Sequence, residues 1–217
     1  MKKISFVVPV FNEEENIHEF HRRLTQVMAP LPYDYEILFI DDGSRDRTSL
    51  LIRELAEKDP HVQGYVFARN FGHQLALTCG LDQSTGDAVI SMDGDLQHPP
   101  EMVPDLLKKW EEGYEIVQTV RKSTEDATWF KSITSRLYYK LINSMSEVRI
   151  TPGGSDFRLM DRKAVDALNR FRERARFIRG MVNNLGFRYT TLEFVAPPRF
   201  AGHSKFSLRK MLRFALD

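Results

Sequence analysis

Cysteine is nearly absent from this chain of 217 residues, which contains only Cys79. A single thiol excludes an internal disulfide and any zinc or iron–sulfur site built from several cysteines. No apolar run approaches the roughly 18 residues that span a bilayer, so the chain as given is not expected to cross a membrane. An excess of charge of one sign is also missing, because 31 Lys and Arg face 30 Asp and Glu. Bulk charge therefore gives no reason to expect a nucleic acid as partner.

Two glycine-rich phosphate-binding motifs are missing as well. No dinucleotide fingerprint follows the first apolar run, and no glycine-rich loop ending in Gly-Lys-Ser/Thr occurs in the sequence. Hydride transfer and P-loop nucleotide hydrolysis both lose their main support. If the protein binds phosphate, it must do so by other means.

The sequence does contain apolar runs of strand length that alternate with helical segments. This alternation is typical of an α/β fold with a mostly parallel, Rossmann-like sheet and helices on both faces. Strands are expected at Ile4–Val10, Tyr35–Ile40, Val62–Ala68, Ala88–Met92 and Ile116–Val120, and helices at about Glu14–Met28, Thr48–Glu57, His73–Gln83 and Pro100–Glu112.

The pattern changes after Arg121. It predicts a long helix at Trp129–Met145, a strand near Phe157–Met160, short helices at Arg162–Phe171 and Ile178–Leu185, and a strand at Tyr189–Val195. We find no linker, and we expect a single domain over residues 1–217 in which residues 122–217 cover residues 1–121.

Acidic residues follow several of the predicted strands. Ligands of an open parallel sheet bind beyond the carboxyl ends of its strands, so these positions matter most. Asp93 and Asp95, with Gln97, form a set of oxygen ligands that suits Mg²⁺ or Mn²⁺. Asp-Gly is also a frequent turn signal, so spacing alone leaves an ordinary turn as the alternative.

Five segments resemble the family-2 glycosyltransferases, in the order typical of that family. They are Val-Val-Pro-Val-Phe-Asn-Glu-Glu (7–14), Ile-Asp-Asp-Gly-Ser-Arg-Asp-Arg-Thr (40–48), Met-Asp-Gly-Asp-Leu-Gln-His-Pro-Pro (92–100), Gly-Ser-Asp-Phe-Arg-Leu-Met-Asp (154–161) and Arg-Phe-Ala-Gly-His-Ser-Lys-Phe-Ser (199–207). Within the family, the resemblance is strongest to the polyprenyl-phosphate branch, which includes dolichyl-phosphate mannose synthases and bactoprenol glucosyltransferases. Five ordered motifs are more specific than any one of them, and they favour the metal interpretation.

The resemblance implies a GT-A fold and direct inverting transfer of a sugar from a nucleotide sugar to a lipid phosphate. It assigns the base and ribose to Pro9, Phe11, Glu13, Asp42 and Asp93. It assigns the metal to Asp95 and Gln97, bordered by Asp93, and the catalytic position to Asp156. Donor or acceptor phosphates would face Arg121, Arg136, Ser204 and Lys205.

The role of Asp156 depends on the acceptor. A lipid monophosphate with a second pKa of about 6 is largely dianionic at neutral pH and scarcely needs a base. We therefore expect Asp156 to orient the acceptor or to take up a residual proton, with two nearby arginines screening repulsion. A saccharide hydroxyl acceptor would instead require a general base.

Several other polar residues have simpler explanations. His73, His98 and His203 are expected to lie at the surface or to form hydrogen bonds rather than to bind metal, because no His pair has helical metal spacing. Cys79 is most simply a packed thiol. Glu14 and Glu15 are accounted for by a helix N-terminus, whereas Glu13 is not.

Two segments combine basic and apolar residues. Arg199–Leu216 carries five basic residues without an acid, and Trp129–Met145 has a similar composition. Both are consistent with amphipathic helices on an anionic membrane surface, or with helices packed on the sheet. Members of the resembling branch commonly continue into transmembrane helices beyond the Ser-Lys motif, so we expect a membrane anchor to be missing from this chain.

The function that we expect is therefore transfer of a sugar from a UDP-sugar, with UDP-glucose favoured, to undecaprenyl or a similar polyprenyl phosphate. The reaction would take place at the cytoplasmic face of the cell membrane. The alternatives are a family-2 enzyme that acts on a saccharide hydroxyl, a nucleotidyltransferase and a non-catalytic scaffold at the membrane surface. The acidic first loop argues against a nucleotidyltransferase, and the sequence leaves a homo-oligomer open.

Overall fold

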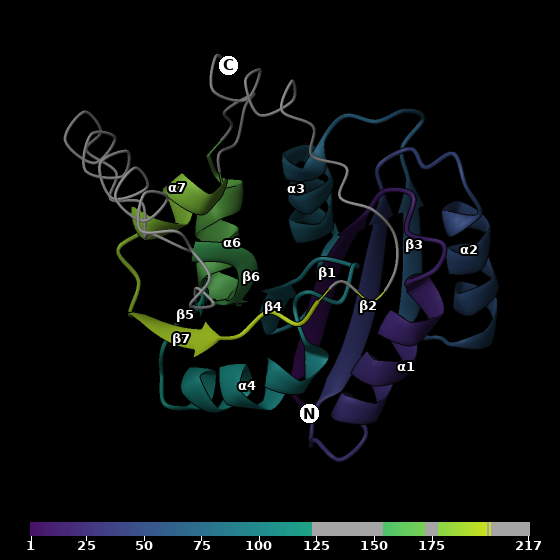
Figure 1. Cartoon of the computed structure of the whole chain (residues 1–217). Coiled ribbons are helices and arrows are strands. Elements are labelled where there is room, and N and C mark those ends of the chain that lie inside the picture. Colours follow the sequence, from purple (N-terminus) through teal and green to yellow (C-terminus); the bar gives the residue numbers. More distant parts are fainter. Residues whose placement is uncertain (123–153, 172–177, 199, 201–217) are drawn as a thin grey trace, which may run out of the picture.

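The computed structural model describes residues 1–122, 154–171, 178–198 and 200. In this part of the chain, one sheet has the strand order β3-β2-β1-β4-β6-β5-β7, with helices on both faces (Figure 1). The strands are β1 (Lys3–Val10), β2 (Asp34–Asp41), β3 (Val62–Val66), β4 (Ala88–Ser91), β5 (Ile116–Arg121), β6 (Gly154–Asp161) and β7 (Tyr189–Phe194). The helices are α1 (Ile17–Met28), α2 (Thr48–Lys58), α3 (His73–Gln83), the 3₁₀ turn η1 (Pro100–Met102), α4 (Val103–Glu111), α6 (Arg162–Asn169) and α7 (Ile178–Asn183).

The sheet is buried on both faces because its central strands are apolar at successive positions. In β1, Phe6 and Val8 join the core on one face, and Val7 joins the core on the other. Continuous apolar strands of this kind are typical of parallel sheets covered by helices. They also explain why β1, β2 and β4 could be predicted from the sequence.

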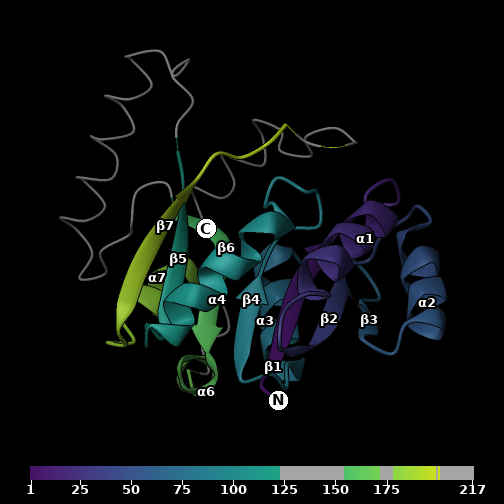
Figure 2. The ribbon, with the colours of Figure 1, turned by 90° about the horizontal axis from the view of Figure 1, so that it is seen from below.

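Helices with one apolar stripe complete the two layers of the core. In α1, Ile17, Phe20, Leu24 and Met28 are buried, a spacing of three to four residues that lines one face of a helix. Residues of α1, α2 and α4 belong to the core on one face of the sheet, and residues of α3, α6 and α7 to the core on the other (Figure 2). Burial of each large apolar side chain contributes about 1.5–3 kcal/mol.

The sequence led us to expect that the second half of the chain covers the first. The described residues of the second half instead also add two strands to the sheet. Strand β6 lies inside the sheet, antiparallel to both β4 and β5, and β7 pairs in parallel with β5 at the edge. The apolar residues Phe157 and Leu159 of β6 face one core and Met160 faces the other, so this strand is as buried as its neighbours. Among the described residues of the second half, α6 and α7 are the elements that cover a face of the sheet.

The antiparallel direction of β6 has a consequence for function. Arg158 pairs with Ser91, the last residue of β4, so the start of β6 lies just beyond the end of β4. The first residues of β6 therefore lie at the carboxyl edge of the parallel strands. This is how Asp156 reaches the edge where the ligands of open α/β sheets bind.

Some predicted element boundaries differ from the observed ones. Helix α1 begins at Ile17 rather than near Glu14, because the backbone amides of Asn16 and Ile17 both donate to the Glu13 carbonyl and form a turn first. The predicted helices at Trp129–Met145 and Arg199–Leu216 lie outside the described residues. Across the described ranges, no helix is both long enough and apolar enough to cross a bilayer.

Candidate functional site

The loops after β1 and β2 are joined to each other by hydrogen bonds. The Asn12 amide donates to Ser44 Oγ at 2.8 Å, and the Arg45 amide donates back to Asn12 Oδ1 at 2.7 Å. The Glu13 amide donates to Thr48 Oγ1 at 2.8 Å. Asn12 has a φ of 51°, a left-handed conformation that Asn tolerates better than most residues. The loop after β1 is therefore held in one shape before any ligand binds.

The predicted base and ribose residues lie on this framework. Pro9 is buried within β1, and Phe11 and Glu13 are half-buried in the loop that follows. The carboxylate of Glu13 accepts a hydrogen bond from Asn16 Nδ2 at 2.5 Å. The structure thus places these three residues at the end of β1 and in the loop that follows it.

Asp42 connects the end of β2 to the start of α3. Its carboxylate accepts hydrogen bonds from the backbone amides of Phe71 at 2.7 Å and Gly72 at 2.9 Å, and the residue is 4% exposed. Gly43 follows with a φ of 71°, and a Cβ there would lie 2.4 Å from the backbone of Arg69. Both residues therefore fix the loop after β3, and the predicted contact of Asp42 with a nucleotide would come in addition to this role.

The loop after β4 carries the predicted metal ligands. The Asp93 amide donates to His98 Nδ1 at 2.9 Å, and the Gln97 amide donates to Asp95 Oδ1 at 3.0 Å. Leu96 has a φ of 63° although it is 1% exposed. A buried non-glycine residue in this conformation is strained, and such strain is typical of functional loops. The turn and the predicted metal site are therefore not exclusive alternatives, because the loop that forms this tight turn also carries both acids.

The donor set of this loop fits a hard divalent cation. Asp93, Asp95 and Gln97 offer carboxylate and amide oxygens, which are the ligands of Mg²⁺ and Mn²⁺. No group of three His, Cys, Asp or Glu side chains that could hold a metal ion occurs in the described ranges.

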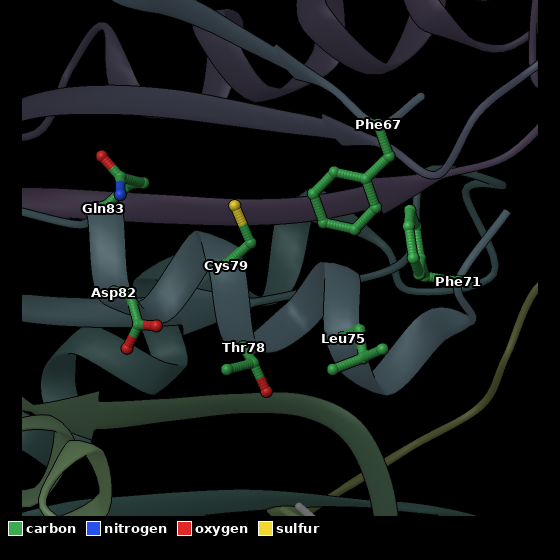
Figure 3. A pocket seen from close by; sticks show the side chains of 7 residues that line it. All are labelled: Phe67, Phe71, Leu75, Thr78, Cys79, Asp82 and Gln83. Atoms are coloured by element: carbon green, nitrogen blue, oxygen red, sulfur yellow. The ribbon is translucent and has the colours of Figure 1, made fainter. Parts of the chain in front are cut away.

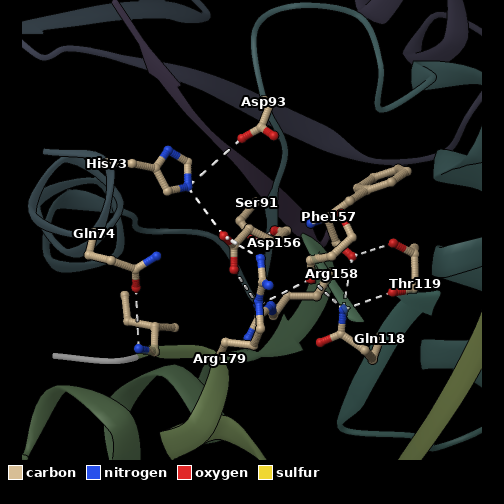
Figure 4. A network of polar contacts seen from close by, with 12 residues as sticks. His73, Gln74, Ser91, Asp93, Gln118, Thr119, Asp156, Phe157, Arg158 and Arg179 are labelled. Atoms are coloured by element: carbon tan, nitrogen blue, oxygen red, sulfur yellow. Dashed lines mark hydrogen bonds and ion pairs between the residues drawn. The ribbon is translucent and has the colours of Figure 1, made fainter. Parts of the chain in front are cut away.

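Asp156 lies at the start of β6 within a cluster of cationic side chains (Figure 4). Arg158 Nη2 donates to its Oδ1 at 2.7 Å, and Arg179 Nη2 donates to its Oδ2 at 3.1 Å. The His73 Nε2 atom lies 3.4 Å from Oδ2 and 3.9 Å from Asp93 Oδ1. His73 thus lies between Asp156 of β6 and Asp93 of the loop after β4.

The surroundings keep Asp156 negatively charged. Burial alone raises the pKa of a carboxyl group, but the hydrogen bond from His73 and the charges of Arg158 and Arg179 outweigh it, so the pKa of Asp156 lies far below its ordinary value. For His73, burial lowers the pKa, but Asp156 and Asp93 more than compensate and raise it. A carboxylate with so low a pKa is a poor proton acceptor. The arrangement therefore favours the orienting role of Asp156 over proton uptake.

Arg158 is the most deeply buried charge of the cluster. Its side chain is fully buried, and its Nε and Nη1 atoms have no hydrogen-bond partner among the described residues. Burial lowers the pKa of Arg158, and Asp156 opposes that shift. Because an unpaired buried charge is costly, the two residues depend on each other.

His98 connects the loop after β4 to the start of β6. Its Nδ1 accepts from the Asp93 amide, so the neutral ring carries its proton on Nε2, which lies 2.6 Å from Ser155 Oγ. The ring also stacks on Phe157 with centroids 5.2 Å apart. His98 therefore forms hydrogen bonds, as the sequence predicted, and it links the predicted metal loop to the residue before Asp156.

The predicted phosphate-binding residues are only partly described. Arg121 ends β5 at the same edge of the sheet as Asp93 and is exposed. Arg136, Ser204 and Lys205 lie outside the described residues. Sequence reasoning assigned no role at the site to Arg179, and it gave His73 no particular partner. His73 could have been singled out because it directly follows the polar segment after β3.

A shallow hollow of about 360 Å³ lies elsewhere, between α3 and the end of β3 (Figure 3). Its lining residues are Phe67, Phe71, Leu75, Thr78, Cys79, Asp82 and Gln83. None of the acids of the strand ends lines it, and its open, largely apolar walls offer few groups that could fix a sugar nucleotide. This hollow is therefore a poor candidate for the site, and the strand ends remain its predicted location.

Comparison with known proteins gives an independent view. Residues 5–168 match the family described as Glycosyl transferase family 2. An uncharacterized glycosyltransferase of Bacillus subtilis, YkcC, is 45% identical over 98% of this chain and 66% of its own length. The bactoprenol glucosyl transferase of Shigella phage SfX is 42% identical over 99% of this chain and 70% of its own length. The chain thus spans about two thirds of the length of these relatives.

Solved structures share the fold. Mannosyl-3-phosphoglycerate synthase from Rubrobacter xylanophilus has a TM-score of 0.68 at 16% identity, over 99% of this chain and 70% of that chain. Glucosyl-3-phosphoglycerate synthase from Mycobacterium tuberculosis, in a complex with Mn²⁺, UDP-glucose and phosphoglyceric acid, has a TM-score of 0.58 at 18% identity, over 97% of this chain and 74% of that chain. The predicted GT-A fold is confirmed.

Proposed function

Because the chain belongs to glycosyl transferase family 2, we propose that it transfers a sugar from a UDP-sugar to a polyprenyl phosphate. UDP-glucose is the favoured donor and undecaprenyl phosphate the favoured acceptor. The name of the phage relative supports this choice of lipid and sugar. The complex of the mycobacterial enzyme with UDP-glucose supports the choice of nucleotide.

The observation that carries the proposal is the environment of Asp156. Arg158 and Arg179 both donate to this carboxylate, so it stays ionised and accepts protons poorly. An acceptor hydroxyl needs a base, whereas a phosphate oxygen is already a nucleophile at neutral pH. The site therefore suits a phosphate acceptor better than a saccharide hydroxyl.

The proposed reaction is a direct displacement at the sugar. An oxygen of the lipid phosphate forms a bond to the anomeric carbon, the bond from that carbon to the β-phosphate of UDP breaks, and UDP leaves with the electron pair. The configuration at the anomeric carbon inverts. Asp156 and the neighbouring arginines hold the acceptor side in line, which supplies the rate advantage of a fixed geometry.

The donor side is assigned to the loops of the first half. Base and ribose would contact Pro9, Phe11, Glu13, Asp42 and Asp93 of the half formed by residues 1–121. Asp95, Gln97 and Asp93 would hold Mg²⁺ or Mn²⁺, and the metal of the mycobacterial complex supports this requirement. When bound, such an ion neutralises charge that develops on the departing diphosphate.

The acceptor side is assigned to residues 122–217 and their surroundings. Arg121, Arg136, Ser204 and Lys205 would contact donor or acceptor phosphates. A polyprenyl phosphate is anchored in a lipid bilayer, so the enzyme would work at a membrane surface, at its cytoplasmic face where UDP-sugars are available. The basic composition of Arg199–Leu216 supports contact with an anionic leaflet.

A donor panel tests the proposed function. Purified protein is incubated with undecaprenyl phosphate, Mg²⁺ or Mn²⁺ and each of several UDP- and GDP-sugars, and both the glycolipid and the released nucleotide are measured. We expect glycolipid with UDP-glucose, and a loss of about a hundredfold or more in Asp95→Asn. Asp166→Asn, which removes an exposed carboxylate of α6, is the matched control and should remain active. Sugar transfer to a saccharide but not to the lipid phosphate would refute the proposal.

A further inference from the structure

Arg179 differs from the other arginine of the Asp156 cluster in its exposure. Its side chain is 37% exposed, whereas that of Arg158 is fully buried. Both donate to the same carboxylate, one to each oxygen. Arg158 thus neutralises Asp156 on the buried side of the carboxylate, and Arg179 adds a positive charge on the side that faces solvent.

The position of Arg179 is set by contacts between two helices. The amide of Ile178, the residue before it, donates to Gln74 Oε1 at 3.3 Å, which joins the start of α7 to the start of α3. Arg179 Nη2 then reaches Asp156 Oδ2 at 3.1 Å. Both the backbone before Arg179 and its side chain are therefore held. The guanidinium lies at the carboxyl edge of the sheet, where Arg179 Nη2 and His73 Nε2 face the same oxygen of Asp156 (Figure 4).

The guanidinium can hold two anions at once. An arginine has five N–H donors in a planar fork, and the structure gives one of them to Asp156 within the described residues. Such a group can bind a carboxylate through one edge and a phosphate through another. Two carboxylates lie near the guanidinium of Arg179. Asp156 also pairs with Arg158, and Asp93 is separated from Arg179 by His73. The local charge therefore favours an incoming anion on the side of Arg179.

We propose that Arg179 binds the phosphate of the lipid acceptor and that Asp156 acts by holding Arg179 in place. The inference rests on the proposed function, because it assigns the acceptor phosphate of that reaction to a particular side chain. It makes Arg179 a substrate-binding residue and Asp156 a positioning residue for it. No proton transfer to Asp156 is needed.

The test separates binding of the acceptor from binding of the donor. Arg179→Gln is compared with Arg179→Lys and with Arg162→Gln, a half-buried arginine whose Nε donates to Gly86 O near the opposite edge of the sheet. Steady-state transfer gives KM for undecaprenyl phosphate, and calorimetry gives the affinities for UDP and for farnesyl phosphate, a short prenyl monophosphate. Farnesol, which lacks the phosphate, separates head-group binding from binding of the hydrocarbon chain.

We expect Arg179→Gln to raise KM for the lipid phosphate and Kd for farnesyl phosphate by about tenfold to a hundredfold, as loss of a charge-assisted hydrogen bond does. The affinities for UDP and farnesol should stay within about twofold, and Arg179→Lys should be intermediate because it keeps the charge but not the fork. Arg162→Gln should change none of them. In the Arg179→Gln background, Asp156→Asn should have no further effect on Kd for farnesyl phosphate.

Three results would overturn the inference in different ways. If the wild type transfers sugar to the lipid and Arg179→Gln has an unchanged KM for it, Arg179 does not bind the acceptor, and the proposed function stands. If Arg179→Gln instead weakens UDP binding, the residue belongs to the donor site. If the wild type binds UDP but neither binds nor uses a prenyl phosphate, the proposed function fails, and the inference fails with it.

Discussion

Asp42 and Asp156 are two aspartates at the same edge of the sheet, and both are nearly buried, with 4% and 9% exposure. Asp42 accepts hydrogen bonds from two backbone amides of the loop before α3. Asp156 instead accepts from the side chains of Arg158 and Arg179, with His73 close by. The same residue type at the same edge thus has two kinds of partner.

The two kinds of partner suggest two roles, one that maintains the shape of the site and one that contacts a substrate. Backbone amides cannot leave their carboxylate without deforming the loop, so Asp42 sets the shape of the site. Side-chain cations can turn part of their hydrogen-bonding capacity toward a ligand, so the Asp156 cluster can respond to a substrate. The side chains that hold Asp156 are therefore better candidates for contact with a substrate than the backbone amides that hold Asp42.

The largest expected effect is that of Asp156→Asn. The variant leaves Arg158 buried without its partner, which costs about 3–5 kcal/mol of unfolding free energy. We expect it to lower transfer by about a hundredfold to a thousandfold as well. Urea unfolding measures the first effect and the glycolipid assay the second.

A double variant separates these two effects. Asp156→Asn combined with Arg158→Met replaces the buried charge by an apolar side chain and should recover most of the lost stability. Transfer should stay low because the acceptor side remains unsupported. Full recovery of transfer would mean that Asp156 serves stability alone.

The contribution of Asp156 to stability should also depend on pH. Its pKa is lowered in the folded protein from an ordinary value of 3.8, so the contribution is present above that value and is lost as the pH falls toward the folded-state pKa. Because Asp156 also raises the pKa of His73, the difference in unfolding free energy between the wild type and Asp156→Asn should decline as the pH rises above about 6.5. On the acid side the difference should shrink below about pH 4, as the carboxylate becomes protonated. A midpoint near pH 6 would show that the carboxylate is not held by the arginines.

A smaller effect is expected for Asp42→Asn. The amide keeps one acceptor oxygen, so the loop before α3 loses one of its two hydrogen bonds to this residue, at about 1–3 kcal/mol. Because the loop belongs to the proposed donor side, KM for the UDP-sugar should rise more than kcat falls. If Asp42→Asn lowers kcat but leaves KM for the UDP-sugar unchanged, Asp42 acts in the reaction, as the Asp156 cluster does, and not by shaping the donor loop.

The smallest effect concerns Cys79, which lines the same hollow as Phe71. Burial, with a smaller contribution from Asp82, raises the pKa of the Cys79 thiol, so its reaction with a disulfide reagent at pH 7.5 should be slow. Asp42→Asn loosens the loop that carries Phe71 and should speed this reaction about twofold to fivefold. Asp156→Asn should leave it unchanged, and equal acceleration by both variants would remove the distinction between the two aspartates.

Most of the fold could be predicted because its signals are local. Continuous apolar runs such as Ile4–Val10 and the three-to-four spacing in α1 are properties of neighbouring residues, and the observed elements follow them closely. The position of β6 between β4 and β5 could not be predicted, because apolar residues fit any interior strand equally well. The order of strands depends on contacts between segments far apart in the chain.

The site, like the fold, has residues that local sequence predicts and contacts that it does not predict. The acids after β2 and β4 were predicted from the rule that strand ends bind ligands, and Asp156 was predicted from its motif. The contact of Asp156 with Arg179 was not, because it joins a strand to a helix 23 residues later. His73 comes from α3, and only the antiparallel direction of β6 brings Asp156 next to it.

Calorimetric titration of UDP-glucose into the protein, with Mn²⁺ and with EDTA, tests the central claim most directly. The wild type should bind the nucleotide sugar with Mn²⁺ and lose at least about tenfold in affinity with EDTA, whereas Asp95→Asn should bind weakly in both conditions. Asp166→Asn should match the wild type. Equal affinity with and without the metal, or an Asp95→Asn variant that binds as tightly as the wild type, would contradict a metal-assisted donor site at these strand ends.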